Sequence, residues 1–290
     1  MVVVRLTGGL GNQLFQYAAA RRVAHINNAS LKLDVSGFES YKLHAYSLKH
    51  FNIREEFASP EEIARFNGSG LTNHLSLWVQ KLRPYYRRAR VVERHFHFDA
   101  NILRISSKNV YLDGYWQSER YFKDIEALLR RELTVKPAPD AANMATSQRI
   151  RGVRSVSLHI RRGDYVSDPI TQQVHGVRSS DYYAAAIAQL SDRVEKPHFF
   201  VFSDDPQWVR ANLKLEHPTT VVAHNGPDKN YEDLRLMSLC QHHIIANSTF
   251  SWWGAWLCTN PDKLVFAPQE WFRTPDRNTK DLIPETWRRI

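Results

Sequence analysis

The sequence is poor in the features that mark secreted, membrane-spanning or zinc-binding proteins. Only two of its 290 residues are cysteines, Cys240 and Cys258, and neither has the spacing to further cysteines or histidines of a zinc site. No apolar run has the length of a membrane span, and the apolar start Met1–Leu6 turns polar at Thr7, too early for a signal peptide. We therefore expect a cytoplasmic chain with reduced cysteines, no signal peptide and no transmembrane segment.

The composition favours a soluble globular protein with an anionic partner. Hydrophobic residues make up 43% and charged residues 24%, which excludes a disordered or fibrous chain. The 39 Lys and Arg exceed the 30 Asp and Glu, for a net charge of +9; nucleotide sugars, nucleic acid and acidic lipid are all suitable partners. The length exceeds that of a usual single core, so two α/β domains with a ligand cleft between them are expected.

The first 35 residues predict a strand, a glycine turn, a helix and a second strand. The strands are Val2–Leu6 and Leu31–Val35, and the helix spans Asn12–Asn27. Helical spacing places Phe15, Ala19, Val23 and Ile26 on one buried face. This is a βαβ unit.

The middle of the chain is less regular. Helical stretches are expected at Pro60–Phe66, Leu71–Lys81 and Glu119–Glu132, and Pro137 and Pro139 interrupt the chain before Met144. We place the domain boundary there, giving an acceptor-side domain over residues 1–148 and a donor-binding domain over residues 149–290.

The second half alternates regularly between strands and helices. The expected strands are Ser155–Ile160, His198–Ser203, Thr219–Ala223, His243–Ala246 and Leu264–Ala267. Helix-start signals precede Tyr182–Leu190, Pro206 and Tyr231–Leu239. This alternation predicts a doubly wound parallel sheet.

Polar residues follow the strands, where open α/β sheets bind ligands. In the first turn, Gly9 and Gly11 allow backbone N–H groups to approach a phosphate ahead of a helix N-terminus. Leu14 stands where a dinucleotide fingerprint has its third glycine, and no P-loop Lys follows. An ordinary strand-to-helix turn explains the glycines equally well.

Two adjacent arginines, Arg161 and Arg162, follow the strand that ends at Ile160. Arginine stays charged and donates through a planar fork, which suits a diphosphate whose negative charge grows as a glycosyl bond breaks. Solvated arginines, or arginines paired with Asp164, are the alternative. His159 by itself is as compatible with packing as with catalysis.

Five segments together resemble the α-1,2-fucosyltransferases of glycosyltransferase family 11. They are Gly8–Gln13, Gly114–Phe122, His159–Tyr165, Val201–Pro206 and Asn247–Leu257, in the family's order and spacing. The resemblance covers nearly the whole chain. One departure is Leu14, where many relatives are expected to have Met; the two side chains are similar in size.

The resemblance implies a GT-B-like fold, GDP-β-L-fucose as donor, inversion at the anomeric carbon and no metal or other cofactor. The expected acceptor is the 2-hydroxyl of galactose in an oligosaccharide or lipid-linked glycan. The sequence has no Asp-x-Asp triplet of the kind that holds a cation in many other glycosyltransferases.

The resemblance also implies site residues. Arg161 binds the diphosphate and is catalytic, while His159 and Asp204 face the guanine, whose N1–H and amino group a carboxylate can accept together. The alternative for Asp204 is the N-cap of the helix that begins at Pro206; the two roles are compatible, since Asp205 is able to cap in its place. The complete expected donor site is Gly9, Gly11, Asn12, Gln13, His159, Arg161, Arg162, Asp204, Asn247, Ser248, Thr249 and Phe250.

Other roles are less defined by the sequence. Asp164 is the expected catalytic base, with Asp168 as a second candidate. Trp252, Trp253 and Trp256 are expected to pack a helix against the sheet. Acceptor sugars are expected to stack on aromatic residues of the first domain, from the set Trp78, Tyr85, Tyr86, Tyr115 and Trp116.

A basic run interleaved with aromatic residues leaves other classes open. It comprises Lys81, Arg83, Arg87, Arg88, Arg90 and Arg94. Such a run usually forms a solvated face of the protein. Peripheral contact with an anionic membrane is a hypothesis for it. A nucleic-acid-binding protein is the alternative functional class, which we do not favour. A transferase for another nucleotide sugar is the other alternative. No oligomeric state is predicted.

Overall fold

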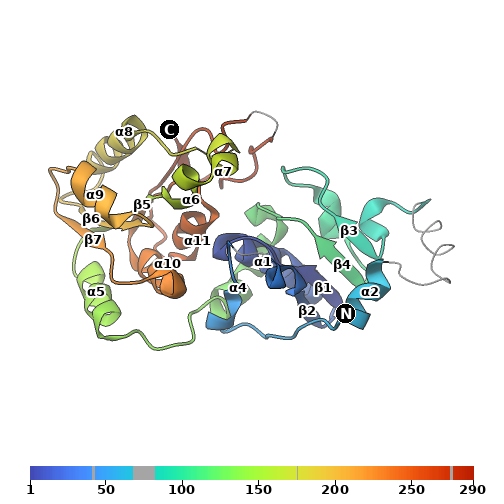
Figure 1. Cartoon of the computed structure of the whole chain (residues 1–290). Coiled ribbons are helices and arrows are strands. Elements are labelled where there is room, and N and C mark those ends of the chain that lie inside the picture. Colours follow the sequence, from blue (N-terminus) through green and yellow to red (C-terminus); the bar gives the residue numbers. More distant parts are fainter. Residues whose placement is uncertain (41–42, 68–81, 175, 275–276) are drawn as a thin grey trace. The chain divides into compact units, whose positions relative to one another are not determined.

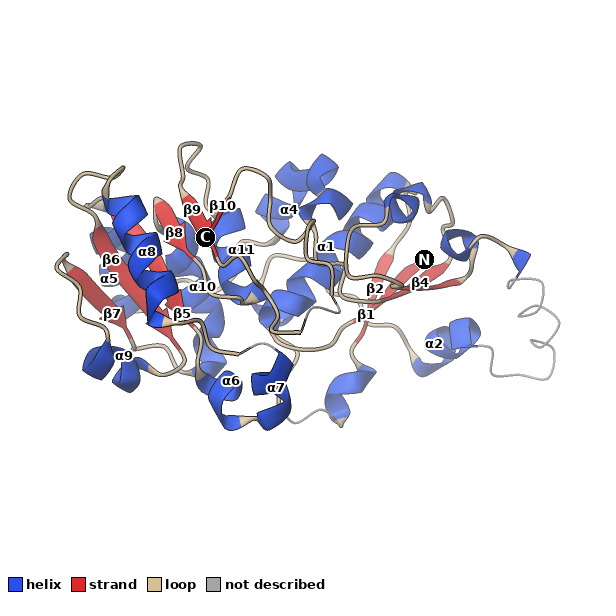
Figure 2. Cartoon of the chain, turned by 90° about the horizontal axis from the view of Figure 1, so that it is seen from above, coloured by secondary structure: helices blue, strands red, loops and turns tan. Residues whose placement is uncertain are grey.

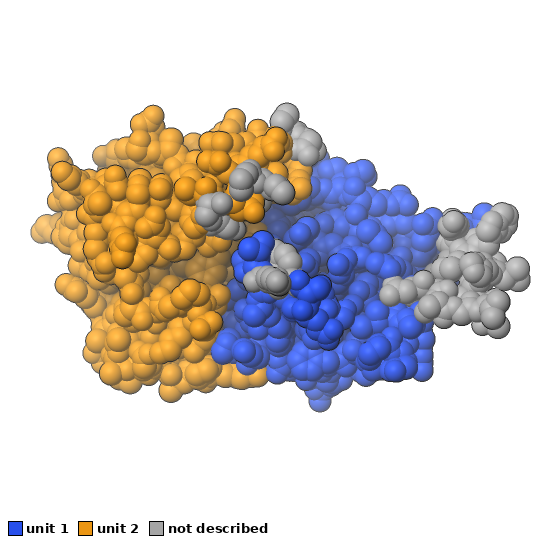
Figure 3. Space-filling model, viewed as in Figure 1, with its two compact units in different colours: residues 1–134, 278–282 blue, residues 135–277, 283–290 orange. Residues whose placement is uncertain are grey.

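The computed structural model describes residues 1–40, 43–67, 82–174, 176–274 and 277–290 (Figure 1). The helix expected at Leu71–Lys81 therefore lies outside the described residues. The chain forms two compact units (Figure 3). Unit 1 comprises Met1–Thr134 and Asn278–Leu282, and unit 2 comprises Val135–Arg277 and Ile283–Ile290.

The boundary between the units precedes the predicted one. Helix α5 (Ala141–Arg151), most of which precedes residue 149, packs against α10 (Asn230–Leu239) in unit 2. Asn143 of α5 donates a hydrogen bond from Nδ2 to Asn225 Oδ1 over 2.9 Å. These contacts attach the helix to the second half of the chain, so the units divide after Thr134 rather than near residue 148.

Unit 1 contains a parallel sheet of four strands in the order β2-β1-β4-β3. The strands are β1 (Val2–Arg5), β2 (Leu31–Asp34), β3 (Arg90–Val92) and β4 (Val110–Asp113). The α-helices described here are α1 (Leu10–Ile26), α2 (Pro60–Asn67) and α4 (Glu126–Glu132). The short 3-10 helices are η1 (Ser36–Glu39), η2 (Leu48–His50), η3 (Tyr85–Arg87), η4 (Ala100–Arg104), η5 (Glu119–Tyr121) and η6 (Lys123–Ile125).

Two sequence-based expectations for unit 1 need correction. Phe15, Ala19 and Val23 of α1 are buried as predicted, but Ile26 is 55% exposed because it ends the helix beyond the core. The helix expected over Glu119–Glu132 is broken into η5, η6 and α4. The break falls at Phe122, whose φ of −145° is not helical and whose side chain is fully buried.

Unit 2 contains a parallel sheet of six strands in the order β10-β9-β8-β5-β6-β7. They are β5 (Ser155–Ile160), β6 (His198–Ser203), β7 (Thr219–Val222), β8 (His242–Ile244), β9 (Val265–Ala267) and β10 (Arg288–Arg289). The other helices are α6 (Gly163–Ser167), α7 (Pro169–Val174), α8 (Ser180–Ser191), α9 (Pro206–Asn212), η7 (Pro227–Lys229) and α11 (Thr249–Leu257). Five of these strands were predicted; β10 is only two residues long and carries no periodic signal.

Helices cover both faces of the unit 2 sheet (Figure 2). Successive side chains of β6 alternate between the two faces of the sheet. Phe199 and Val201 pack on the face covered by α8, while Phe200 and Phe202 pack on the opposite face, against α5 and α10. Because both faces are covered, β5 is buried at every position. The predicted doubly wound α/β fold is therefore confirmed.

Candidate functional site

The site in unit 2 lies where the direction of chain winding reverses. From β5 the chain adds β6 and β7 on one side, and then β8, β9 and β10 on the other. The two neighbouring connections leave in opposite directions, and ligands of open α/β sheets bind at the carboxyl ends of the strands at that point. Here those ends carry His159–Arg162 after β5 and Asn247–Thr249 after β8. Two of the sequence motifs therefore converge.

Arg161 and Asp204 form the central ion pair of this edge. Arg161 Nη1 lies 2.9 Å from Asp204 Oδ2, and the side chains are 25% and 24% exposed. The other carboxylate oxygen, Oδ1, accepts a hydrogen bond from the backbone N–H of Arg162 over 2.8 Å. Asp204, which follows β6, thus fixes the tip of β5. Whether Asp164 also pairs with the arginines stays a prediction, because its side chain lies outside what the structure describes.

Arg162 is held against α9. Its Nε lies 3.3 Å from Asp205 Oδ2, and its guanidinium carbon lies 3.9 Å from the centre of the Trp208 ring. Asp205 in turn caps α9, because its Oδ1 accepts from Trp208 N over 3.0 Å. Asp205 is therefore the N-cap of α9, and Asp204 is the partner of Arg161.

Gly163 is a requirement of this arrangement that the sequence did not single out. A Cβ atom at this position would lie 2.5 Å from Asp204 Oδ2, far inside van der Waals contact. The glycine of the His159–Tyr165 motif thus admits the carboxylate to the end of β5. The signal that could have indicated it was the glycine directly after two arginines.

His159 is buried behind the ion pair. Its side chain is 4% exposed, and Nδ1 has no hydrogen-bond partner among the described residues. Burial lowers the pKa of its imidazole to about 4, so the ring is neutral at pH 7. The ring centre lies 5.7 Å from that of Phe250 on α11. A neutral imidazole with an unused nitrogen is able to hydrogen-bond an uncharged ligand group.

The start of α11 forms the other wall. Ser248 Oγ accepts from Phe250 N over 3.3 Å and caps the helix, which leaves its own O–H available as a donor. Thr249 is the first helical residue and is partly exposed. Helix N-termini favour anions through their backbone N–H groups and the helix dipole.

Asn247 has a supporting position rather than an exposed one. It is 1% exposed, and its Nδ2 donates to the backbone carbonyls of Gly176 (3.3 Å) and Trp271 (3.1 Å). These bonds bring the segment beginning at Gly176 beside the start of α11. Asn247 therefore holds these loops together, and its predicted contact with the donor stays a prediction.

Two residues near this edge were missed by the sequence analysis. Arg178 donates from Nη1 to Glu270 O over 2.8 Å, and burial lowers the pKa of its guanidinium. Tyr183 of α8 donates its hydroxyl to His159 O over 3.2 Å. Tyr183 thereby supports the end of β5, and Arg178 fixes the loop that contains Glu270. Both precede or lie within a helix with no strand-end signal, so only the fold could place them here.

The tryptophans of α11 pack the helix, as predicted. Trp252 and Trp253 are fully buried and Trp256 is 3% exposed. The rings of Trp253 and Trp256 meet edge to face with centres 5.1 Å apart. They therefore hold the helix in place and are not available to stack on sugar.

The other predicted donor residues lie in unit 1. Gly8 has φ +75° and Gly9 is the N-cap of α1, so Gly11 falls within the first turn, where it is buried. Asn12, partly exposed, accepts at Oδ1 from Gln117 Nε2 over 2.9 Å. Their contact with a donor stays a prediction.

Gln13 of α1 lies beneath the glycine turn. It is fully buried; its Nε2 donates to Gly8 O (2.8 Å) and Ala45 O (2.9 Å), and its Oε1 accepts from Ser47 N (2.9 Å). These bonds tie the glycine turn to the loop around residue 45. Gln13 therefore organises the turn, and its contact with a donor stays a prediction.

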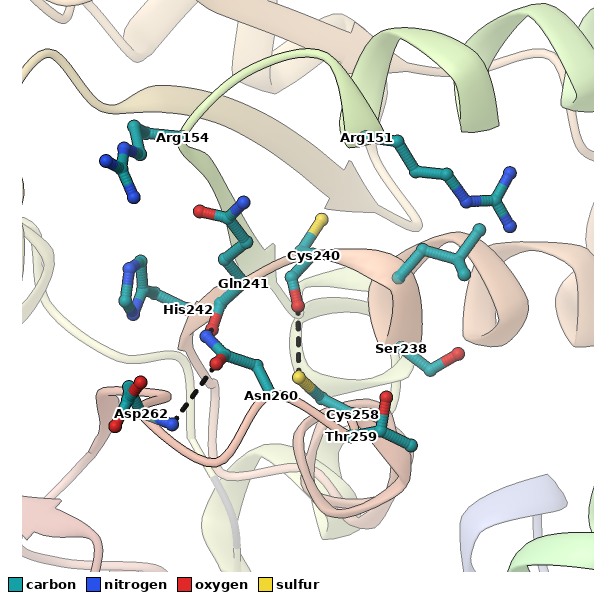
Figure 4. Close-up of a pocket in the computed structure, with 11 residues that line it drawn as sticks. Arg151, Arg154, Ser238, Cys240, Gln241, His242, Cys258, Thr259, Asn260 and Asp262 are labelled. Atoms are coloured by element: carbon teal, nitrogen blue, oxygen red, sulfur yellow. Dashed lines mark hydrogen bonds between the residues drawn. The ribbon is translucent and has the colours of Figure 1, made fainter.

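A hollow in unit 2 lies away from these residues (Figure 4). It has a volume of about 480 Å³ and its lining includes Arg154, Gln241, Cys258 and Asn260. Arg154 precedes β5 and Gln241 precedes β8, so the hollow lies at the amino ends of the strands. Parallel sheets of this type bind ligands at the opposite ends.

Among the described residues there is no cluster of three or more histidine, cysteine or acidic side chains able to hold a metal ion. In the same part of the chain no helix is both long and apolar enough to cross a membrane.

Two solved structures have the same fold. A GDP complex of a mutant of FUT1 from Arabidopsis thaliana matches with a TM-score of 0.52 and 12% identity, over 98% of this chain and 74% of that one. The fucosyltransferase NodZ from Bradyrhizobium matches with a TM-score of 0.52 and 15% identity, over 91% and 94%. The fold is thus the GT-B-like fold of glycosyltransferases, as the sequence predicted.

Sequence relatives define the family. Residues 1–288 match the model of glycosyl transferase family 11. An alpha-1,2-colitosyltransferase from Escherichia coli is 37% identical over 100% of this chain and 99% of its own length. The O-antigen biosynthesis glycosyltransferase WbnK from the same species is 32% identical over 97% and 98%. A galactoside 2-alpha-L-fucosyltransferase from Bos taurus is 25% identical over 88% and 63%. The chain therefore belongs to glycosyl transferase family 11.

Proposed function

We propose that this glycosyltransferase moves L-fucose from GDP-β-L-fucose to the 2-hydroxyl of a galactose residue, with inversion and without a metal ion. The product is an α-1,2-linked glycan. The observation that carries the proposal is the assembly at the winding reversal of unit 2. There a guanidinium, a carboxylate and the capped start of a helix meet at the end of β5.

Each group in this assembly has a role in the proposed reaction. The Arg161 guanidinium stabilises the charge that develops on the β-phosphate as the glycosyl bond breaks, and the first-turn N–H groups of α11 add to that stabilisation. Asp204, fixed by Arg161 and the backbone of Arg162, accepts from the guanine edge. Neutral His159, with its unused Nδ1, hydrogen-bonds the base beside it. In this proposal the Arg161 guanidinium and the first-turn N–H groups of α11 stabilise the leaving diphosphate without a cation.

The names of the relatives support a donor of the fucose type. One relative is a colitosyltransferase and another a galactoside fucosyltransferase. Colitose is fucose without its 3-hydroxyl, so the two GDP-sugars are the alternatives that a donor assay must separate. A site that hydrogen-bonds the 3-hydroxyl would reject GDP-colitose strongly, whereas an apolar site would discriminate weakly.

The acceptor is proposed to be a galactose-terminated oligosaccharide or a lipid-linked glycan. The O-antigen relative supports the second form. Asp164 is the proposed base for the acceptor hydroxyl. Asp168, which lies between α6 and α7 and is partly exposed, is the second candidate.

The basic run of unit 1 is only partly a solvated face. Arg90 pairs with Asp113 over 2.6 Å, and the Arg94 guanidinium lies 4.0 Å from the centre of the Tyr85 ring. Lys81 lies outside the described residues. Peripheral contact with anionic membrane stays a hypothesis for the exposed Arg83 and Arg87; sedimentation with acidic vesicles at low salt tests it, and an unbound protein would end it.

The deciding experiment is turnover of GDP-fucose and GDP-colitose against a panel of galactose-terminated glycans, with NMR of the product linkage. We expect transfer from GDP-fucose, an α-1,2 product and unchanged turnover in the presence of EDTA. Loss of turnover with EDTA that added metal restores would refute metal independence. Asp164→Asn should abolish transfer while leaving GDP binding intact; full turnover would exclude Asp164 as the base.

A further inference from the structure

The turn after β4 in unit 1 has an unusual backbone. Trp116 has φ +55°, a left-handed conformation that costs a non-glycine residue roughly 1–2 kcal/mol. Its side chain is 1% exposed, and its indole Nε1 has no hydrogen-bond partner among the described residues. The largest side chain of the turn thus points inward, in a conformation that something else must hold.

Glu93 holds it. Its Oε2 accepts from Tyr115 N over 2.8 Å and its Oε1 accepts from Trp116 N over 3.0 Å. Glu93 directly follows β3, and its own N–H donates to Asp113 O over 2.8 Å. A Cβ atom on Gly114 would lie 2.4 Å from Glu93 Cβ, so only glycine admits this approach. We call this arrangement of Glu93, Gly114 and Trp116 the Glu93 clasp.

The clasp leaves Tyr115 on the outside. Tyr115 is 39% exposed between the clasped Gly114 and the buried Trp116. It follows β4, which pairs with β1 in the middle of the β2-β1-β4-β3 order, so it lies at the carboxyl ends of these parallel strands. Gln117 donates to Asn12 over 2.9 Å and so joins the turn to the glycine turn after β1. An exposed ring therefore lies at the ligand-binding edge of this sheet, beside amide groups.

The other aromatic residues expected to bind sugar are occupied or inward. The Tyr85 ring is covered by the Arg94 guanidinium at 4.0 Å and meets Tyr86 edge to face at 5.7 Å. Trp116 is buried, and Trp78 lies outside the described residues. Tyr115 is the member of the described set with an exposed ring at the carboxyl edge.

We propose that Tyr115 is the stacking platform for the acceptor galactose and that Glu93 is its positioning residue. This rests on the proposed function. Galactose gathers C–H groups on one face of its ring, and such a face packs on an aromatic side chain while its hydroxyls remain free to hydrogen-bond polar groups around the ring. Because the Glu93 clasp fixes the backbone at Tyr115, this segment does not have to be ordered when the acceptor binds, and binding loses less conformational entropy.

Steady-state kinetics of Tyr115→Ala, Tyr115→Phe and Glu93→Gln test the assignment, with Phe57→Ala as the matched control. Phe57 is 48% exposed in the same unit, and its ring contacts Tyr46. We expect Tyr115→Ala to raise the acceptor KM about tenfold, with the GDP-fucose KM unchanged, and Tyr115→Phe to restore it. Glu93→Gln, which cannot accept both N–H bonds with its amide, should raise the acceptor KM in the same direction.

Binding without turnover separates this inference from the proposed function. Saturation-transfer NMR with methyl β-galactoside should give a signal in wild type and Phe57→Ala and lose it in Tyr115→Ala. Binding with no turnover of any GDP-sugar would refute the proposed function while supporting the platform. Equal signal in Tyr115→Ala, a raised donor KM in place of the acceptor KM, or no galactoside signal from wild type would overturn the platform.

Discussion

Replacing Gly163 by alanine should disrupt donor binding without unfolding the protein. The φ of Gly163 is not in the positive range, so alanine meets no backbone strain there. Its Cβ would instead lie 2.5 Å from Asp204 Oδ2, whereas ordinary contact begins at 3.4 Å. The carboxylate must therefore move by at least 0.9 Å, which disturbs its bonds to Arg161 and to the Arg162 N–H.

The size of the effect follows from the bonds that this shift breaks. Asp204 is bonded at 2.9 Å to Arg161 and at 2.8 Å to Arg162 N. Hydrogen bonds to a charged group contribute roughly 1.5–3 kcal/mol, and partial exposure of this pair reduces the value to about 1–2 kcal/mol. We expect the Kd for GDP to rise about tenfold. The Tm should fall by only about 2–4 °C per kcal/mol lost.

Isothermal titration with GDP and thermal unfolding of the same samples measure both effects. Gly226→Ala is the matched control, because a Cβ atom there meets open space. If Gly163→Ala binds GDP as tightly as Gly226→Ala, then Asp204 does not contribute to the donor site and the reasoning fails.

Three further changes test the roles of single residues. Arg161→Lys keeps the charge but loses the planar fork of the guanidinium, so kcat should fall about 10²–10³-fold with little loss of GDP affinity. Arg210→Lys, on the exposed face of α9, is the control and should leave kcat unchanged. Equal kcat values for the two variants would exclude Arg161 as the stabilising group. Gln13→Ala removes three buried hydrogen bonds and should lower the free energy of unfolding by roughly 2–4 kcal/mol in urea titrations, and an unchanged value would contradict its role in the turn. The pKa of His159 is lowered to about 4 in the folded protein, so the unfolded chain takes up the proton first as the pH falls. The free energy of unfolding should therefore decrease by up to about 3 kcal/mol between pH 6.5 and pH 4, with no loss above about pH 7. His159→Phe should flatten this pH dependence, and an unaltered slope would show that the ring is not buried in its neutral form.

The sequence by itself determined the chain's class. The alternation of strands and helices from Ser155 onward fixed the parallel sheet, because buried strands and capped helices leave local signals that tertiary contacts here reinforce. The five segments in family order identified the family. The tryptophans of α11 as packing residues also followed from local chemistry, since apolar helix faces act over a few residues, whereas the choice of Asp205 over Asp204 as helix cap needed the structure.

Only the tertiary structure decided which polar residues of the motifs are buried and which distant residues they bond. Gln13 and Asn247 belong to motifs, yet both are buried and bonded to distant backbone carbonyls. The pairing of Arg161 with Asp204 joins residues 43 positions apart, at the ends of neighbouring strands. Glu93 and Trp116 form a clasp that neither motif nor periodicity indicates. Such contacts depend on strand order, which local sequence does not encode, because it is set by which buried faces pack together once the whole chain has folded.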